Sequence, residues 1–265
     1  MDFTARDLRL YADDREIGKG CRMMLTARQD LTLRPALHHL EIIDLSDSSA
    51  TMLTGAKFLE VRSGLSVLAF GEPIEVLTKT TQGKRITSAV FSPGLSLWRS
   101  SVSLSLPGGM TVTDTLRKLL AAASGIQDSG SNAGFSSDIS LAAFTAENRV
   151  LSRPQAFFGR TCDALTLLAE TVNADAFLSS AGLCVTGREA ASPAFSMPES
   201  DLLSAPLMTG SHLIISVRML TLNPGSWIRT EWKGVPYSGR IISSLIQADN
   251  HSGPWKSELE LETDL

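Results

Sequence analysis

The closing stretch of the chain decides its fold class: residues 222–262 read LNPGSWIRTEWKGVPYSGRIISSLIQADNHSGPWKSELELE. In the last eight residues, Trp255, Ser257, Leu259 and Leu261 alternate with Lys256, Glu258, Glu260 and Glu262. Successive side chains of a β-strand point to opposite faces, so this two-residue period predicts a strand with one buried and one polar face. We therefore expect the chain to end inside a sheet, with an edge of the kind that commonly pairs with a partner.

Two turn signals divide the rest of this stretch. Leu222-Asn223-Pro224-Gly225 combines a fixed φ with a residue that tolerates positive φ, and it predicts a turn before a strand over Ser226 to Trp232. Lys233-Gly234-Val235-Pro236 predicts a second turn before a strand over Tyr237 to Ala248. With the loop Asp249 to Pro254, these segments predict a three-stranded meander without proline inside its strands.

Length and charge bound the remaining possibilities. A chain of 265 residues can bury a sizeable core without metal or disulfide support. Its 24 basic and 28 acidic residues give a net charge of −4, and no basic cluster stands out, so we do not expect nucleic-acid binding.

The cysteines and the apolar runs indicate the cellular compartment in which the protein is made. The three cysteines are widely spaced within apolar runs (Cys21, Cys162 and Cys184), which predicts reduced, buried thiols rather than a disulfide framework or zinc site. The charged N-terminus does not resemble a signal peptide, and no apolar run reaches the roughly 18 residues of a membrane span. We expect a protein made in a cytoplasm, without stable membrane insertion.

The first third of the chain has the composition of short strands separated by polar turns. The predicted strands are Cys21 to Thr26, Leu37 to Leu45, Phe58 to Val61, Leu65 to Phe70, Ile74 to Thr78 and Lys84 to Phe91, with a helical turn within Ser46 to Thr54. This spacing is typical of a small barrel or sandwich.

The middle of the chain changes to helical periodicity. Thr111 can cap a helix that has Asp114 at its third position and an apolar face ending near Gly125. A surface loop is expected over Gln127 to Ser137, a second helix over Thr161 to Val172, and a hairpin after it (Ala176 to Ser179 and Leu183 to Thr186). The proline-containing segment Arg188 to Thr209 is interpreted as a linker to a sheet beginning at His212.

These elements predict a mainly β protein with an α/β insert, of the α+β class. We expect two small β-barrel-like domains, residues 1–100 and 189–265, flanking a two-helix α/β domain, residues 101–188. Two β domains in tandem give each chain two similar edges, and three chains would present six.

The sequence carries no common catalytic or cofactor motif, and we expect neither enzymatic activity nor a cofactor or metal. His38 and His39 fall on opposite faces of a strand, which favours structural roles. His251 favours a loop-stabilising hydrogen bond over a metal or general-base role. Cys162 precedes a helix, where its thiol pKa could fall, yet its inward position favours a buried thiol. An enzyme using Cys162 or His251 is the least favoured reading, because no convergent partners can be named.

Several segments together resemble bacteriophage tail baseplate hub proteins of the late control protein D type. The resemblance rests on the order of mostly glycine, proline and apolar positions over residues 100–262. The matching positions are Val102 to Leu106, Gly109 to Leu116, Ser152-Arg153-Pro154, Gly159-Arg160, Asp163-Ala164-Leu165, Leu222, Pro224-Gly225, Gly239 to Ile242, His251, Trp255, Leu259 and Leu261.

The resemblance implies a structural protein of the virion, assembled in the host cytoplasm. It implies a homotrimeric ring of two tube-like β-barrels per chain, whose pseudo-sixfold symmetry joins a hexameric tail tube, or distal tail protein, to a trimeric central spike. We expect Trp255, Leu259 and Leu261 to anchor the closing strand. Glu258 and Glu260 form an acidic face that is either solvated or a partner contact. The helix opening at Thr111 also resembles a LysM module, so the alternative function is cell-wall glycan binding.

Overall fold

The computed structural model describes residues 6–124, 141–189, 195–218 and 221–263. The chain forms two compact units. The β unit comprises residues 1–30, 36–93 and 192–265, and the inserted unit comprises residues 31–35 and 94–191. The division into three domains stays a prediction, because compactness alone does not show which segments fold independently.

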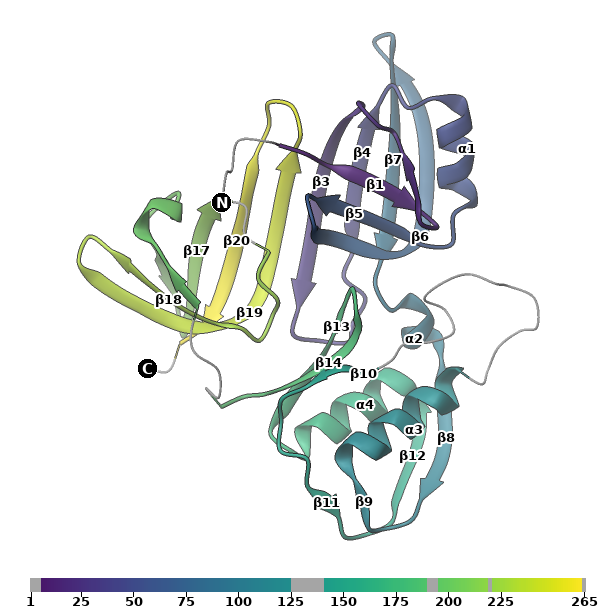
Figure 1. Ribbon diagram of the computed structural model, residues 1–265, viewed down its shortest axis with the longest axis vertical. Coiled ribbons are helices and arrows are strands. Elements are labelled where there is room, and N and C mark those ends of the chain that lie inside the picture. The colour runs from purple at the N-terminus through teal and green to yellow at the C-terminus, as the bar shows by residue number, and fades with distance from the viewer. Residues whose placement is uncertain (1–5, 125–140, 190–194, 219–220, 264–265) are drawn as a thin grey trace. The chain divides into compact units, whose positions relative to one another are not determined.

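The β unit is built on one thirteen-stranded sheet (Figure 1). Its main path runs in the order β16-β17-β20-β19-β3-β4-β7-β6-β5-β1-β2, and β18 joins β15 to β19. The path has two ends within the described residues, so the expected barrel-like domains are not closed barrels. The strands are β1 (Arg9–Ala12), β2 (Arg15–Ile17), β3 (Arg22–Asp30), β4 (His38–Ile43), β5 (Leu59–Ser63), β6 (Ser66–Thr81), β7 (Lys84–Ser92), β15 (Phe195–Met197), β16 (Leu207–Thr209), β17 (His212–Arg218), β18 (Trp227–Trp232), β19 (Val235–Asp249) and β20 (Trp255–Glu262).

The sheet contains the same arrangement of five strands twice. In the first module, β3 to β7, the order is β3-β4-β7-β6, and β5 pairs with the first part of β6. In the second module, β16 to β20, the order is β16-β17-β20-β19, and β18 pairs with the first part of β19. Each long strand also has a register irregularity against its partner, between Pro73 and Glu75 in β6 and between Ile241 and Ser243 in β19. The two modules are therefore a structural repeat.

The modules join where β3 lies antiparallel to β19 (Figure 1). Seven residue pairs form this junction, from Ser243 opposite Asp30 to Asp249 opposite Met24. Its buried side chains come from both modules: Leu25 lies opposite Ala248, and Ala27 lies opposite Ile246. The four are at most 2% exposed, so the junction is part of the core.

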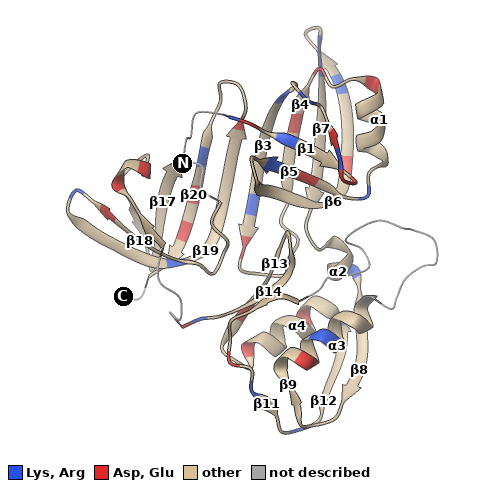
Figure 2. Ribbon diagram, in the orientation of Figure 1, with Lys and Arg blue, Asp and Glu red and all other residues tan. Residues whose placement is uncertain are grey.

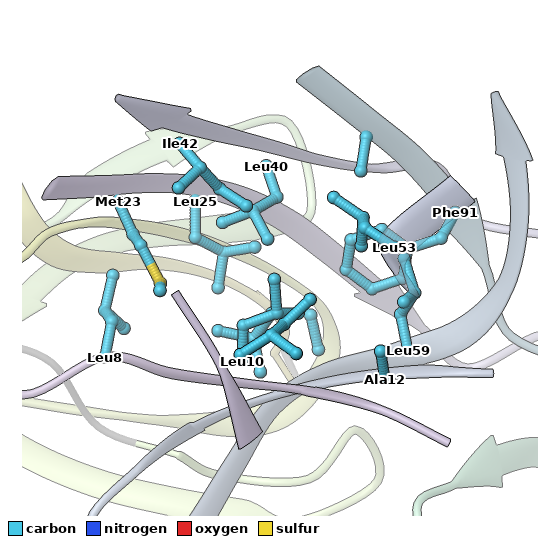
Figure 3. Close-up of a cluster of buried hydrophobic side chains, with 14 of the residues drawn as sticks. Leu8, Leu10, Ala12, Met23, Leu25, Leu40, Ile42, Leu53, Leu59 and Phe91 are labelled. Atoms are coloured by element: carbon cyan, nitrogen blue, oxygen red, sulfur yellow. The ribbon is translucent and has the colours of Figure 1, made fainter. Parts of the chain in front are cut away.

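Two apolar cores lie against this sheet. The first core gathers side chains of β1, β3, β4, β5 and α1 (Asp47–Gly55), and Figure 3 shows Leu10, Leu25, Leu40 and Leu53 converging in it. The second core is smaller: nine of the described residues are buried in it, among them Leu213 and Ile215 of β17 and Leu259 and Leu261 of β20. Strand β19 supplies both cores, with Ile246 in the first and Ile241 in the second.

One register irregularity lets β19 serve both cores. Ile241 lies opposite Leu261 and Ser244 lies opposite Leu259, with one extra residue between these pairs on β19. In a regular strand, Ile241 and Ile246 would point to opposite faces, because they are an odd number of residues apart and side chains alternate along a strand. The bulge therefore returns Ile241 to the buried face.

Strand β6 corrects a sequence prediction. The separate strands predicted at Leu65 to Phe70 and Ile74 to Thr78 are one continuous strand that passes from β5 to β7. Gly71 makes this passage possible, because a Cβ at this position would lie 2.2 Å from the backbone carbon of Ser92. Its φ of 148° is also one that side chains rarely adopt.

The inserted unit packs two helices, α3 and α4, against the antiparallel pair of β8 and β12. Its core includes Leu116, Leu119 and Leu120 of α3 and Leu165 and Leu168 of α4. The elements are α2 (Leu95–Arg99), β8 (Ser101–Leu106), β9 (Met110–Thr111), α3 (Val112–Ser124), β10 (Leu141–Phe144), β11 (Val150–Leu151), β12 (Gln155–Arg160), α4 (Thr161–Glu170), β13 (Ala174–Ser179) and β14 (Gly182–Gly187).

The predicted start of the first inserted helix is confirmed. The Thr111 hydroxyl oxygen accepts a hydrogen bond from the Asp114 amide at 3.2 Å and donates to its carboxylate at 2.7 Å, which satisfies a free amide at the helix start. The loop predicted over Gln127 to Ser137 lies outside the described residues. None of the described helices has the length and apolar character needed to cross a bilayer.

Other boundaries differ because local signals were weak. Strands β1 and β2 and helix α2, which are three to five residues long, were not predicted. The predicted linker Arg188 to Thr209 contains β15, a 3₁₀ turn (Glu199–Asp201) and β16. The turn before β19 is shorter than expected, since Lys233 and Gly234 both have positive φ and form a two-residue hairpin, leaving Pro236 inside the strand.

Candidate functional site: the closing strand and its neighbours

The inward face of β20 matches the predicted alternation. Ser257, Leu259 and Leu261 are fully buried, opposite Val217, Ile215 and Leu213 of β17. Trp255 continues this face but is only partly buried, and it packs against the first core. The inward face of β20 therefore extends from the first core, at Trp255, to the second core, at Leu259 and Leu261.

The outward face of β20 carries charges that are largely paired. Figure 2 shows both basic and acidic segments along β20. Lys256 and Glu258 form an ion pair with 2.5 Å between Nζ and Oε1. Glu260 accepts a hydrogen bond from Ser243 at 2.9 Å and lies 2.7 Å from Nδ1 of His212. Partial burial raises the pKa of Glu260, but these hydrogen bonds outweigh burial and lower it overall.

The loop before β20 is tied to β3 by Asp249 and Asn250. Asp249 is buried, accepts a hydrogen bond from Arg22 at 2.6 Å, and has a lowered pKa because this bond and nearby amides outweigh the cost of burial. Asn250 accepts a hydrogen bond from the Met23 amide at 2.9 Å and donates to the Cys21 carbonyl at 3.0 Å. The amide of His251 donates to Asp249 at 2.8 Å while its side chain is exposed. The backbone of His251, rather than its ring, thus makes the loop hydrogen bond.

Arg22 and Asn250 were not identified from the sequence. Their partners lie more than 220 positions away, at the junction of the two modules. The only sequence signal was the polar pair Asp249-Asn250 at the end of a predicted strand, which does not indicate its partner. These hydrogen bonds between Arg22, Asp249 and Asn250 lie at the end of the junction and hold the start of the loop against β3.

The other predicted histidines and cysteines have the surroundings of structural residues. His38 is buried, its ring lies 5.2 Å from that of Phe91, and burial lowers its pKa to about 4, whereas His39 is exposed. Burial, and then the charge of Asp163, raises the pKa of Cys162, which disfavours a thiolate nucleophile. All three cysteines are free, and Cys21 is only partly buried. No group of three metal-ligating side chains occurs in the described part of the chain.

The inserted unit has a cavity of about 290 Å³ beside α4. Asp163, Thr166 and Glu170 line it from one face of α4, and Trp98 lies beneath the guanidinium of Arg160 at 4.7 Å. Its Asp175 is held by Arg188 at 2.8 Å. Cys162 also lines the cavity, and its thiol donates a weak hydrogen bond to the Asp163 carboxylate at 3.8 Å, but burial raises the pKa of this thiol and so disfavours an activated nucleophile here.

No protein-family model and no curated protein matches the sequence. Solved structures do match. A tail protein from Neisseria meningitidis is 16% identical, with a TM-score of 0.69 over 97% of this chain and 96% of that one. A 43 kDa tail protein of prophage MuSo2 from Shewanella oneidensis is 10% identical, with a TM-score of 0.69 over 96% of both chains.

A third match is a component of the type VI secretion system of E. coli, described as similar in structure to the T4 tail proteins gp27 and gp5. It is 10% identical, with a TM-score of 0.60 over 96% of this chain and 77% of that one. The resemblance to tail baseplate hub proteins is thus confirmed at the level of the fold: the chain folds as phage tail proteins do.

Proposed function

We propose that this chain is a structural protein of a phage tail or a related contractile machine. One observation carries the proposal: the likeness to the tail proteins extends over at least 96% of both chains, rather than over a single shared module. A fold can host several functions, so the assignment to a tail needs a direct test.

Within the tail, we place the protein at the baseplate hub, as a homotrimeric ring between a hexameric tube and a trimeric spike. The internal repeat supports this position. Each chain contributes two modules of the same strand order, so three chains would present six similar modules to a sixfold partner while keeping threefold symmetry toward the spike.

The role requires no catalysis and no cofactor. The raised pKa of the buried Cys162 thiol disfavours a thiolate nucleophile, which supports a role in assembly. Binding of cell-wall glycan remains the alternative.

Light scattering of the full chain, alone and with the neighbouring spike protein, tests the proposal. We expect a mass of three chains, at least with the spike protein, since assembly can depend on partners. Reconstruction of the particle should show three copies around the tail axis. One copy or six copies around the axis would refute the ring.

A further inference from the structure

Two of the open edges in the sheet of the β unit lie on β16 and on the second part of β6. In the described residues, β16 pairs only with β17, and residues Glu75–Thr81 of β6 pair only with β7. Unpaired edges expose backbone donors and acceptors that can bind another strand. Leu77 on one edge is 43% exposed, and Leu207 and Met208 on the other are 60% and 44% exposed.

Strand direction makes the two edges compatible. From β16 to β6 the path has eight strands, and each is antiparallel to the next. Because the number is even, β6 runs opposite to β16. A second copy that places its β16 beside β6 would therefore continue the antiparallel sheet without a change of pattern.

The junction within the chain supplies a template for this contact. Glu75 follows the bulge of β6 as Ser243 follows that of β19, and these residues lie opposite Val90 and Glu260. The next strands continue the correspondence: Val90 lies opposite His39, and Glu260 lies opposite Ile214.

One further step reaches the outer strands. His39 lies opposite Thr26 on β3, and Ile214 lies opposite Leu207 on β16. By its place in the repeat, β16 therefore corresponds to β3, and the free part of β6 corresponds to the part of β19 that pairs with β3.

We propose that β6 of one copy pairs with β16 of the next copy, in the register that β19 and β3 use within the chain. Leu77 then lies opposite Thr209, Thr78 opposite Met208, and Lys79 opposite Leu207. The contact is head-to-tail, so repeated copies form a ring when the rotation between neighbours closes, as the proposed hub function requires. The number of copies rests on the proposed hub function, whereas the pairing itself rests on the strand order.

Burial supports the same contact. In the junction within the chain, Ala27 and Ile246 are at most 2% exposed. Their counterparts on the open edges are Met208, which is 44% exposed, and Thr78, which is also exposed. The contact between copies would bury these side chains as the internal junction buries theirs.

Paired cysteines test the register in the full chain. Residues directly opposite in an antiparallel pair have Cα atoms about 4.5–5.5 Å apart, within the range that a disulfide spans. We expect the double variant Leu77→Cys with Thr209→Cys to give chains linked into a closed covalent trimer on mild oxidation. The matched control, Leu77→Cys with Met208→Cys, is displaced by one residue and should give little product, because its thiols point to opposite faces. Wild type reports any linkage through the native cysteines.

The outcomes separate the pairing from the hub. If the Leu77→Cys and Thr209→Cys variant forms covalent chains of more than three copies, the strand pairing is supported and the threefold ring is refuted. A trimer by light scattering without this linkage refutes the pairing and leaves the ring. Monomers without linkage at every concentration and with the spike protein overturn both.

A second measurement does not depend on disulfides. Met208→Asp should reduce the trimer fraction at least tenfold with little change in melting temperature, because this side chain is exposed in the single chain. Leu65→Asp, at a fully exposed turn position, should leave assembly unchanged. Equal assembly of the two variants would overturn the pairing.

Discussion

Truncation of Leu259 to alanine should unfold the second module at a much lower temperature than wild type. Leu259 is fully buried, between Ser244 of β19 and Ile215 of β17, in a core to which the described residues contribute nine buried side chains. Leucine truncation in cores costs about 2–5 kcal/mol, and strands on both sides limit how far this cavity can collapse, so we expect about 3–5 kcal/mol. At about 2–4 °C per kcal/mol for a unit of this size, melting should fall by about 6–20 °C.

The measurement is thermal and urea unfolding followed by tryptophan fluorescence, which Trp227 and Trp232 of the second module report. The matched control is Glu258→Ala, one residue away on the opposite face, which breaks only a surface ion pair with Lys256 worth about 0–1 kcal/mol. If Leu259→Ala melts like wild type while Glu258→Ala is strongly destabilised, the assigned register of β20 is wrong.

Three further predictions concern the polar residues. Burial lowers the pKa of His38 from 6.5 to about 4, so the fold keeps its full stability above pH 6.5, and about 3 kcal/mol of unfolding free energy should be lost as the pH falls toward 4. His38→Gln should flatten this part of the pH profile measured by urea unfolding. An unchanged profile would contradict this prediction. Glu258→Lys should leave the melting temperature within about 2 °C of wild type. Glu260→Lys should lower the melting temperature further, because Glu260 accepts a hydrogen bond from Ser243 and faces His212. Equal effects of the two variants in differential scanning calorimetry would refute this difference. Cys162→Ser and His251→Ala should change stability or assembly only, and a peptidoglycan hydrolysis that disappears in either folded variant would show an enzyme instead.

Much of the local structure followed from the sequence. The two-residue alternation of Trp255 to Glu262 predicts a strand and its buried face, and burial of Leu259 and Leu261 confirms it. Thr111 marks the start of α3 because a hydroxyl satisfies a free amide at the helix start. The interface roles of Trp255, His251, Glu258 and Glu260 remain predictions, although the structure gives the two carboxylates close intramolecular partners.

Side-chain period and residues with special φ predict most of the longer strands, turns and helices. They do not predict which strands lie side by side. Pairing of β3 with β19 unites residues more than 200 positions apart, and the burial of Asp249 against Arg22 depends on it. A strand's period specifies its faces but not the partner at its edges, because backbone hydrogen-bonding groups are the same in every strand. The repeat of the two modules, and the edges that it leaves open, therefore became visible only once the strands were paired.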